Sequence, residues 1–163
     1  MKILFLTRKT WYSDLMIEYL LKFFPKTKIV KKKIFKINQK FDYILCVGYQ
    51  NIVPRNILDK IKIASINIHP GSVYNPGAGC YSYPLFNNEK FTGLTAHHMH
   101  YLPDEGNVIL YKKVPIKKND DFLSLQKRVL KEKIKFFKQI VKIIKSKKTL
   151  PNSKIQWKKK PRL

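Results

Sequence analysis

Apolar and polar positions along the chain follow two periods, and their order is typical of an α/β fold. Short apolar runs that end at glycine, proline or charged residues predict strands, and longer segments with apolar residues three or four positions apart predict helices. The predicted strands are Lys2–Thr7, Thr27–Phe35, Phe41–Val47, Ile63–His69, Thr92–Met99 and Asn107–Ile116, and the predicted helices are Trp11–Phe24, Arg55–Ile61 and a long one from Phe122 to Ile144.

Local residue choices support these boundaries. Lysines interrupt the apolar pattern of Thr27–Phe35, which predicts a strand near the edge of a sheet, with one face in water. Thr10 or Ser13 can cap the first helix, and the run Asn119-Asp120-Asp121 can cap the long one. The alternation of strands and helices predicts an open, mostly parallel sheet with helices on both faces.

A candidate site lies at the end of the fourth predicted strand. Asn67 and His69 are two positions apart, so their side chains share one face of the strand at a spacing of roughly 7 Å. Pro70 and Gly71 end the strand abruptly, which places the pair at its carboxyl end, where open α/β sheets bind ligands. A lone histidine at such a position commonly has a structural role, so a functional assignment for His69 depends on the motifs around it.

Composition narrows the class of protein. A chain of 163 residues suits a single domain, and no apolar run is long enough to span a membrane. Cys46 and Cys80 lie in an apolar run and after a glycine loop, a pattern that favours a reducing, cytoplasmic setting over a disulfide scaffold. The net charge of +24 favours anionic partners in general, but the abundance of lysine behind it is also what an AT-rich genome would produce.

Three histidines crowd the fifth predicted strand and raise the question of a metal site. His98 and His100 share one face of that strand, whereas His97 points to the other. No cysteine or fourth ligand is placed beside them in the sequence, so we expect no metal.

Three blocks together resemble the family of formyltransferases that use 10-formyltetrahydrofolate. They are Asn67-Ile68-His69-Pro70 with the loop through Gly79, then Thr92-Gly93-Leu94-Thr95-Ala96-His97, then Asp104-Glu105-Gly106-Asn107-Val108-Ile109. The resemblance extends from about Tyr43 to Val129. It implies a Rossmann-like α/β fold whose final strand pair is antiparallel.

The resemblance also implies roles for particular residues. Asn67, His69 and Asp104 are expected to be catalytic, with formyl transfer through a tetrahedral intermediate, and His97 to pack beside them. The folate co-substrate is expected to bind around Gly48, Tyr49, Gln50, Asn51, Ile52 and Gly106. Neither the reaction nor the folate requires a metal.

The acceptor amine is the least constrained part of this interpretation. The run Asn75–Tyr83 looks most similar to sugar N-formyltransferases, and no glycine-rich phosphate loop follows the first strand. We therefore expect a nucleotide-linked amino sugar, bound by Tyr74, Tyr81 and Tyr83. An enzyme acting on RNA, like methionyl-tRNA formyltransferase, and a non-catalytic basic binding module are the alternatives.

The chain is expected to comprise a catalytic domain over residues 1–150 and a basic tail over residues 151–163. The tail carries Trp157 followed by a lysine run, and is either disordered or lies over the sheet as similar tails do in that family. A homodimer is possible. The sequence does not predict a membrane partner, and a nucleic-acid partner is possible but not favoured.

Overall fold

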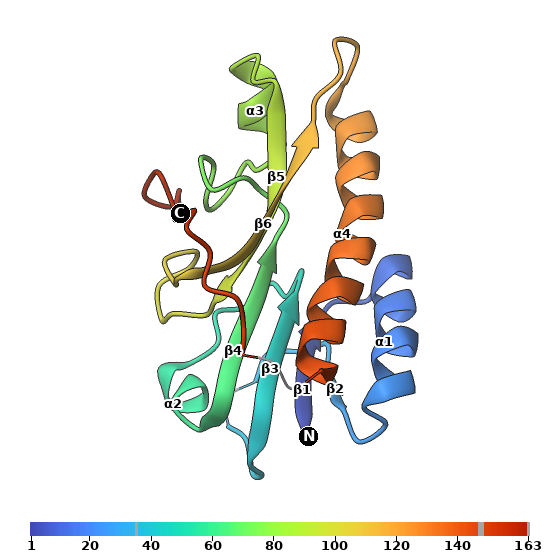
Figure 1. Ribbon diagram of the computed structural model, residues 1–163, viewed down its shortest axis with the longest axis vertical. Coiled ribbons are helices and arrows are strands. Elements are labelled where there is room, and N and C mark those ends of the chain that lie inside the picture. Colours follow the sequence, from blue (N-terminus) through green and yellow to red (C-terminus); the bar gives the residue numbers. More distant parts are fainter. Residues whose placement is uncertain (35, 147–148, 163) are drawn as a thin grey trace.

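The computed structural model describes residues 1–34, 36–146 and 149–162. Helices separate most, but not all, of the successive strands along the chain (Figure 1). The strands are β1 (Ile3–Thr7), β2 (Lys28–Val30), β3 (Phe41–Val47), β4 (Ile61–His69), β5 (Phe91–His98) and β6 (Val108–Pro115); the helices are α1 (Trp11–Phe23), α2 (Arg55–Leu58), α3 (Ser82–Phe86) and α4 (Phe122–Lys145).

The six strands form one mixed sheet in the order β2-β1-β3-β4-β5-β6. Neighbours from β2 to β4 run parallel, whereas β5 runs antiparallel to both β4 and β6. The predicted fold, an open and mostly parallel sheet with a final antiparallel pair, is confirmed. Strand β4 therefore has a parallel neighbour, β3, on one side and an antiparallel neighbour, β5, on the other.

Each face of the sheet is covered. Helices α1 and α4 pack side by side on one face (Figure 1), over a core that includes Phe5, Leu45 and Phe137. The short helix α2 covers part of the other face, where Ile57 packs with Leu6 and Ile44. Among the described residues, no helix combines the length and apolar character needed to cross a membrane.

Most predicted boundaries agree with the structure to within two residues. The strand Phe41–Val47 is found as predicted, and the predicted caps are present: Thr10 accepts from the Ser13 amide at 3.2 Å and Asp121 from the Ser124 amide at 2.7 Å. The predicted strand Thr27–Phe35 is wrong in length, because only Lys28–Val30 pairs with β1; Phe35 lies outside the described residues.

Helix α2 is also shorter than the predicted Arg55–Ile61. Its end is set by the sheet, because Ile61 already pairs with Phe41 of β3. The pairing of Ile61 within the sheet therefore outweighs the helical spacing of apolar residues in this short segment.

The packing of α4 against the sheet gives a stability prediction. Phe137 is fully buried, and its ring centroid lies 5.4 Å from that of Phe5 in β1. We expect Phe137→Ala to lower the free energy of unfolding by about 3–5 kcal/mol, through lost burial and the cavity left behind. Leu123→Ala on the same helix, where the side chain is 58% exposed, should cost far less. Denaturant titration measures both, and similar losses would contradict this packing.

Candidate functional site

Strand β4 presents its polar residues where the sheet changes direction. Asn67 pairs with Cys46 of β3 on one side and with His97 of β5 on the other. His69 is the last residue of β4 and is 6% exposed. The predicted pair therefore lies at the carboxyl end of a central strand, and His97 stands beside Asn67 across the ladder.

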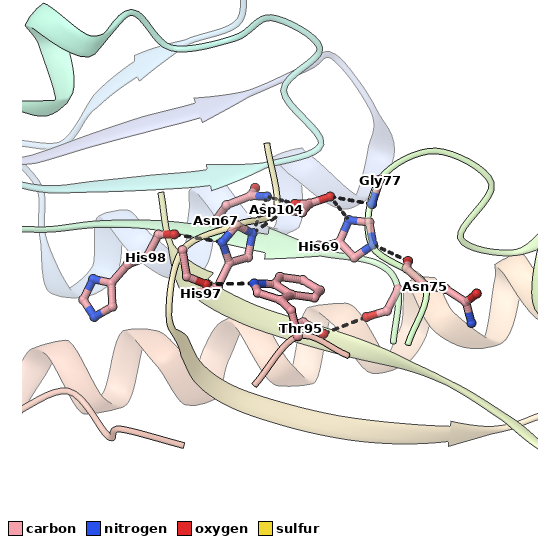
Figure 2. A network of polar contacts seen from close by, with 11 residues as sticks. Asn67, His69, Asn75, Gly77, Thr95, His97, His98 and Asp104 are labelled. Carbon is pink, nitrogen blue, oxygen red and sulfur yellow. Dashed lines mark hydrogen bonds and ion pairs between the residues drawn. The ribbon is translucent and has the colours of Figure 1, made fainter. Parts of the chain in front are cut away.

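Asp104 enters this site from the turn between β5 and β6. Its backbone has φ of +51°, a conformation that is uncommon for a residue with a side chain and that often marks functional sites. Its carboxylate lies between the two histidines (Figure 2), with Oδ2 3.2 Å from Nδ1 of His69 and Oδ1 3.1 Å from Nε2 of His97. The amide of Gly77 donates to Oδ2 at 2.9 Å.

Asn67 completes the cluster. Its Nδ2 lies 3.1 Å from Nε2 of His97 and 3.5 Å from Oδ1 of Asp104. The carboxamide is therefore held by the same carboxylate that contacts both imidazoles. The three residues expected to be catalytic lie together as one polar network.

In each imidazole, the nitrogen that does not face Asp104 lies against a backbone carbonyl (Figure 2). Nε2 of His69 lies 3.2 Å from the Asn75 oxygen, and Nδ1 of His97 lies 2.8 Å from the His98 oxygen. A neutral ring has one N–H and can donate either to the carbonyl or to Asp104. A cationic ring has two N–H groups and donates to both. Asp104 thus stabilises an added proton on a neighbouring ring.

Burial and nearby charge shift the pKa values of Asp104 and His69 in opposite directions. Burial alone would raise the pKa of the Asp104 carboxyl, but the hydrogen bonds from His97 and Gly77 and the charge of His69 bring that pKa down to about 2. Burial lowers the pKa of His69 below 6.5, while Asp104 opposes that shift. At neutral pH the site therefore holds a neutral His69 beside a carboxylate.

A cavity of about 300 Å³ opens onto this cluster. Asn67, His69, His97 and Asp104 form one part of its wall, and the loop after β3 forms another, including all five predicted folate-binding residues of that loop, which are Gly48, Tyr49, Gln50, Asn51 and Ile52. Tyr49 is anchored at its outer end, where its hydroxyl donates to the Lys32 carbonyl at 2.9 Å. The volume is at the lower end of the range typical of small-ligand sites.

The other predicted binding residues do not line this cavity. Gly106 packs against β5, where a Cβ atom would lie 1.7 Å from the His98 carbonyl oxygen. Tyr81 is buried in the core and contacts Phe122, while Tyr74 and Tyr83 are 47% and 42% exposed outside the cavity. The cavity thus joins the residues expected to be catalytic to the Gly48–Ile52 loop, and the three tyrosines lie apart from it.

Sequence reasoning missed several residues that support the site. Asn75 and Gly77 contact His69 and Asp104 through backbone atoms, so their side chains carry no signal of that role. Trp157 packs on both histidines from the far end of the chain, with ring centroids 5.9 Å from His69 and 5.1 Å from His97. One of the two expectations for the tail, that it lies over the sheet, pointed toward this contact without specifying the histidines.

Within the ranges that the structure describes, no three histidine, cysteine, aspartate or glutamate side chains are grouped so that they could hold an ion.

Comparison with known sequences connects this geometry to a family. The profile described as "Formyl transferase" matches residues 26–141. Methionyl-tRNA formyltransferase of Ehrlichia chaffeensis is 33% identical over 100 residues, which cover 61% of this chain and 32% of that protein. The corresponding enzyme of Alkaliphilus oremlandii is 38% identical over 80 residues, 48% of this chain and 26% of its own. The matches span about a third or less of these curated relatives.

Comparison with solved structures extends over nearly the whole chain. The N-formyltransferase from Helicobacter canadensis, in complex with folinic acid and dTDP-3-aminofucose, has a TM-score of 0.79 at 20% identity and covers 99% of this chain and 71% of its own. A formyltransferase from Anoxybacillus kamchatkensis, in complex with a UDP-linked formamido sugar and tetrahydrofolate, has a TM-score of 0.76 at 21% identity, with 99% and 85% covered. At these identities the likeness establishes the fold.

The coupling between His69 and Asp104 can be measured by NMR. We expect the His69 imidazole to titrate below pH 6.5, because burial lowers its pKa. Asp104→Asn should lower that pKa further, since it removes the negative charge that favours the imidazolium. Asp14→Asn, which removes an equal charge from the exposed surface of α1, should leave it unchanged. A midpoint above 6.5, or no response to Asp104→Asn, would contradict the arrangement.

Proposed function

We propose that this chain, which belongs to the formyl transferase family, moves a formyl group from 10-formyltetrahydrofolate to a primary amine. The observation that carries the proposal is the meeting of a carboxamide, an imidazole and a carboxylate on one wall of a cavity. Acyl transfer to an amine requires a donor to the developing oxyanion, an acceptor for the amine proton and a group that controls that acceptor. Asn67, His69 and Asp104 can fill these three roles.

Asn67 is proposed to stabilise the oxyanion of the tetrahedral intermediate. Its Nδ2 carries two N–H bonds: one faces Oδ1 of Asp104 at 3.5 Å, and the other is free for the oxyanion when Nε2 of His97 donates its own proton to Asp104. A preorganised donor of this kind typically contributes about 3 kcal/mol to transition-state stabilisation. Because Asn67 lies on a central strand, the donor needs little reorganisation during the reaction.

His69 is proposed to accept the proton from the attacking amine. Burial keeps its ring neutral near pH 7, which is the form a base requires. The positive charge of the protonated ring is stabilised by Asp104, which lies 3.2 Å from Nδ1 and remains ionised because its pKa is about 2. Asp104 thus orients the imidazole and offsets the charge that forms on it.

The loop from Gly48 to Ile52 is proposed to bind the folate. All five of its residues line the same cavity as the catalytic cluster, so a ligand held by the loop lies within reach of Asn67 and His69. Tetrahydrofolate or a formylated folate is bound in solved proteins of this fold, which supports the assignment.

For the acceptor we propose the amino group of a nucleotide-linked amino sugar. Solved proteins with this fold, covering 99% of the chain, are complexed with dTDP-linked or UDP-linked sugars. Tyr74 lies on the loop that follows His69 and Tyr83 lies in α3, and both side chains are exposed enough to contact such a substrate. Tyr81 contributes to the loop's packing rather than to an exposed surface.

A second candidate acceptor is aminoacylated tRNA. The curated relatives named above are methionyl-tRNA formyltransferases. Helix α4 also presents a row of exposed lysines, namely Lys127, Lys131, Lys135, Lys138, Lys142 and Lys145. Such a surface favours phosphate backbones and gives steeply salt-dependent binding.

The catalytic roles predict large losses of rate. His69→Asn removes the base and Asp104→Ala removes the group that orients it, so each should lower kcat/KM for formyl transfer by about a hundredfold or more. Asp14→Asn serves as a surface control for the loss of a carboxylate. Formyl transfer is followed by the mass gained on the amine, and near-normal rates in either site variant would refute the assignment.

The two acceptors can be separated in one comparison. Purified chain and 10-formyltetrahydrofolate are incubated with a panel of nucleotide-linked amino sugars or with methionyl-tRNA, and formylated product is measured by mass. We expect transfer to an amino sugar with a weak dependence on salt. Transfer to methionyl-tRNA alone, with affinity falling steeply as salt rises, would instead establish the second candidate.

A further inference from the structure

The segment from Ser153 to Arg162, called the strap here, lies across the loops that support the catalytic cluster. The Ser153 amide donates to the Val108 carbonyl at 3.1 Å, and the Lys158 amide donates to the Val73 carbonyl at 2.9 Å. Arg162 then pairs with Gly77 in a short parallel bridge. Figure 1 shows the strap, in red, ending beside the loop that precedes α3.

Trp157 holds one side of the Asp104 turn. Its Nε1–H donates to the Gly106 carbonyl at 2.8 Å, two residues beyond Asp104. The other side of Gly106 lies against the His98 carbonyl, where no Cβ atom would fit. The turn is therefore fixed between β5 and the indole, which also packs edge-on against the rings of His69 and His97.

Arg162 holds the opposite side of the cluster through the loop after β4. Its carbonyl accepts from the Ala78 amide at 2.9 Å, and its backbone lies so close to Gly77 that a Cβ there would be 2.1 Å from the Arg162 oxygen. Nη2 donates to Oδ1 of Asn75 at 3.1 Å, and the guanidinium stacks 3.8 Å above the Tyr83 ring.

The loop residues that Arg162 fixes are those that contact the catalytic pair. Gly77 donates its amide to Asp104, and the Asn75 carbonyl lies against Nε2 of His69. Trp157 and Arg162 are not among the residues lining the cavity. The strap thus contacts the side of the cluster away from the cavity, and it does so mainly through the backbone atoms that orient His69 and Asp104.

We propose that Trp157 and Arg162 are positioning residues that hold Asp104 and His69 in the geometry required for proton transfer. This proposal rests on the proposed function for its link to catalysis, although the contacts can be tested without it. Two features require such support. Asp104 keeps a left-handed backbone that persists only where its surroundings fix it, and its carboxylate must face two rings at once.

The test uses full-length Trp157→Phe and Arg162→Ala. Trp157→Phe keeps an aromatic ring but loses the bond to Gly106. Arg162→Ala loses the side-chain contacts to Asn75 and Tyr83 and keeps the backbone bond to Ala78. Trp11→Phe and Lys159→Ala are matched controls, since Trp11 is 60% exposed and Lys159 is an exposed lysine of the strap itself. Two quantities are measured: hydrogen exchange of the Gly77 amide, and kcat and KM for formyl transfer.

We expect both strap variants to speed exchange of the Gly77 amide by about tenfold or more, because the bond to Asp104 opens more often. We also expect kcat to fall by about tenfold to a hundredfold with KM for the folate changed less than about twofold, since the cavity lining is intact and only the alignment is loosened. Both controls should behave like the unsubstituted chain.

Two results would overturn the proposal. Unchanged Gly77 exchange in both variants would show that the Trp157 and Arg162 side chains do not hold the Asp104 contact. Faster exchange with unchanged kcat would show that the strap is structural and irrelevant to catalysis. If the unsubstituted chain transfers no formyl group to any amine, the proposed function fails, while the Gly77 measurement still decides whether the strap fixes the cluster.

Discussion

The interaction on which the site depends is the sharing of one buried carboxylate by two imidazoles. Asp104 is 8% exposed, and a carboxylate in such surroundings is stable only when it is paired and hydrogen-bonded. His69, His97 and the Gly77 amide supply these partners. Because the folded state lowers the pKa of Asp104 to about 2, this contribution to stability is present above pH 4 and is lost as the pH falls toward 2.

The fold brings these partners together from four separate segments. Strand β4 provides His69, the neighbouring antiparallel strand β5 provides His97, and the turn after β5 provides Asp104. The loop after β4 contributes the Gly77 amide. The change from parallel to antiparallel pairing at β4 matters here, because it sets His97 directly across from Asn67, and the turn after β5 then folds back so that Asp104 reaches His69.

Much of the fold follows from the sequence. The strand Phe41–Val47 is apolar except for Asp42 and lies between Lys40 and Gly48, and the alternation that ends at His69 places Asn67 and His69 on one face before any contact is known. Short elements were less predictable: β2 and α2 are limited by pairing with β1 and β3, which local spacing does not reveal.

The site was predictable only where side chains carry the role. The spacing of Asn67 and His69 points to a shared face, and Asp104 was expected from the family resemblance. Asn75, Gly77 and Gly106 act through backbone atoms, so residue type alone gives no signal. Trp157 reaches the site because the strap crosses the loops, a long-range contact that no local pattern specifies.

The central claim is that Asp104 acts through His69, and a double-mutant cycle tests it most directly. Rates of formyl transfer are compared for His69→Asn, Asp104→Ala and the variant carrying both. If Asp104 serves to orient and charge-stabilise His69, the double variant should be about as slow as the slower single variant, because the second loss removes nothing further. Multiplication of the two losses would show that the residues act independently and would contradict the account.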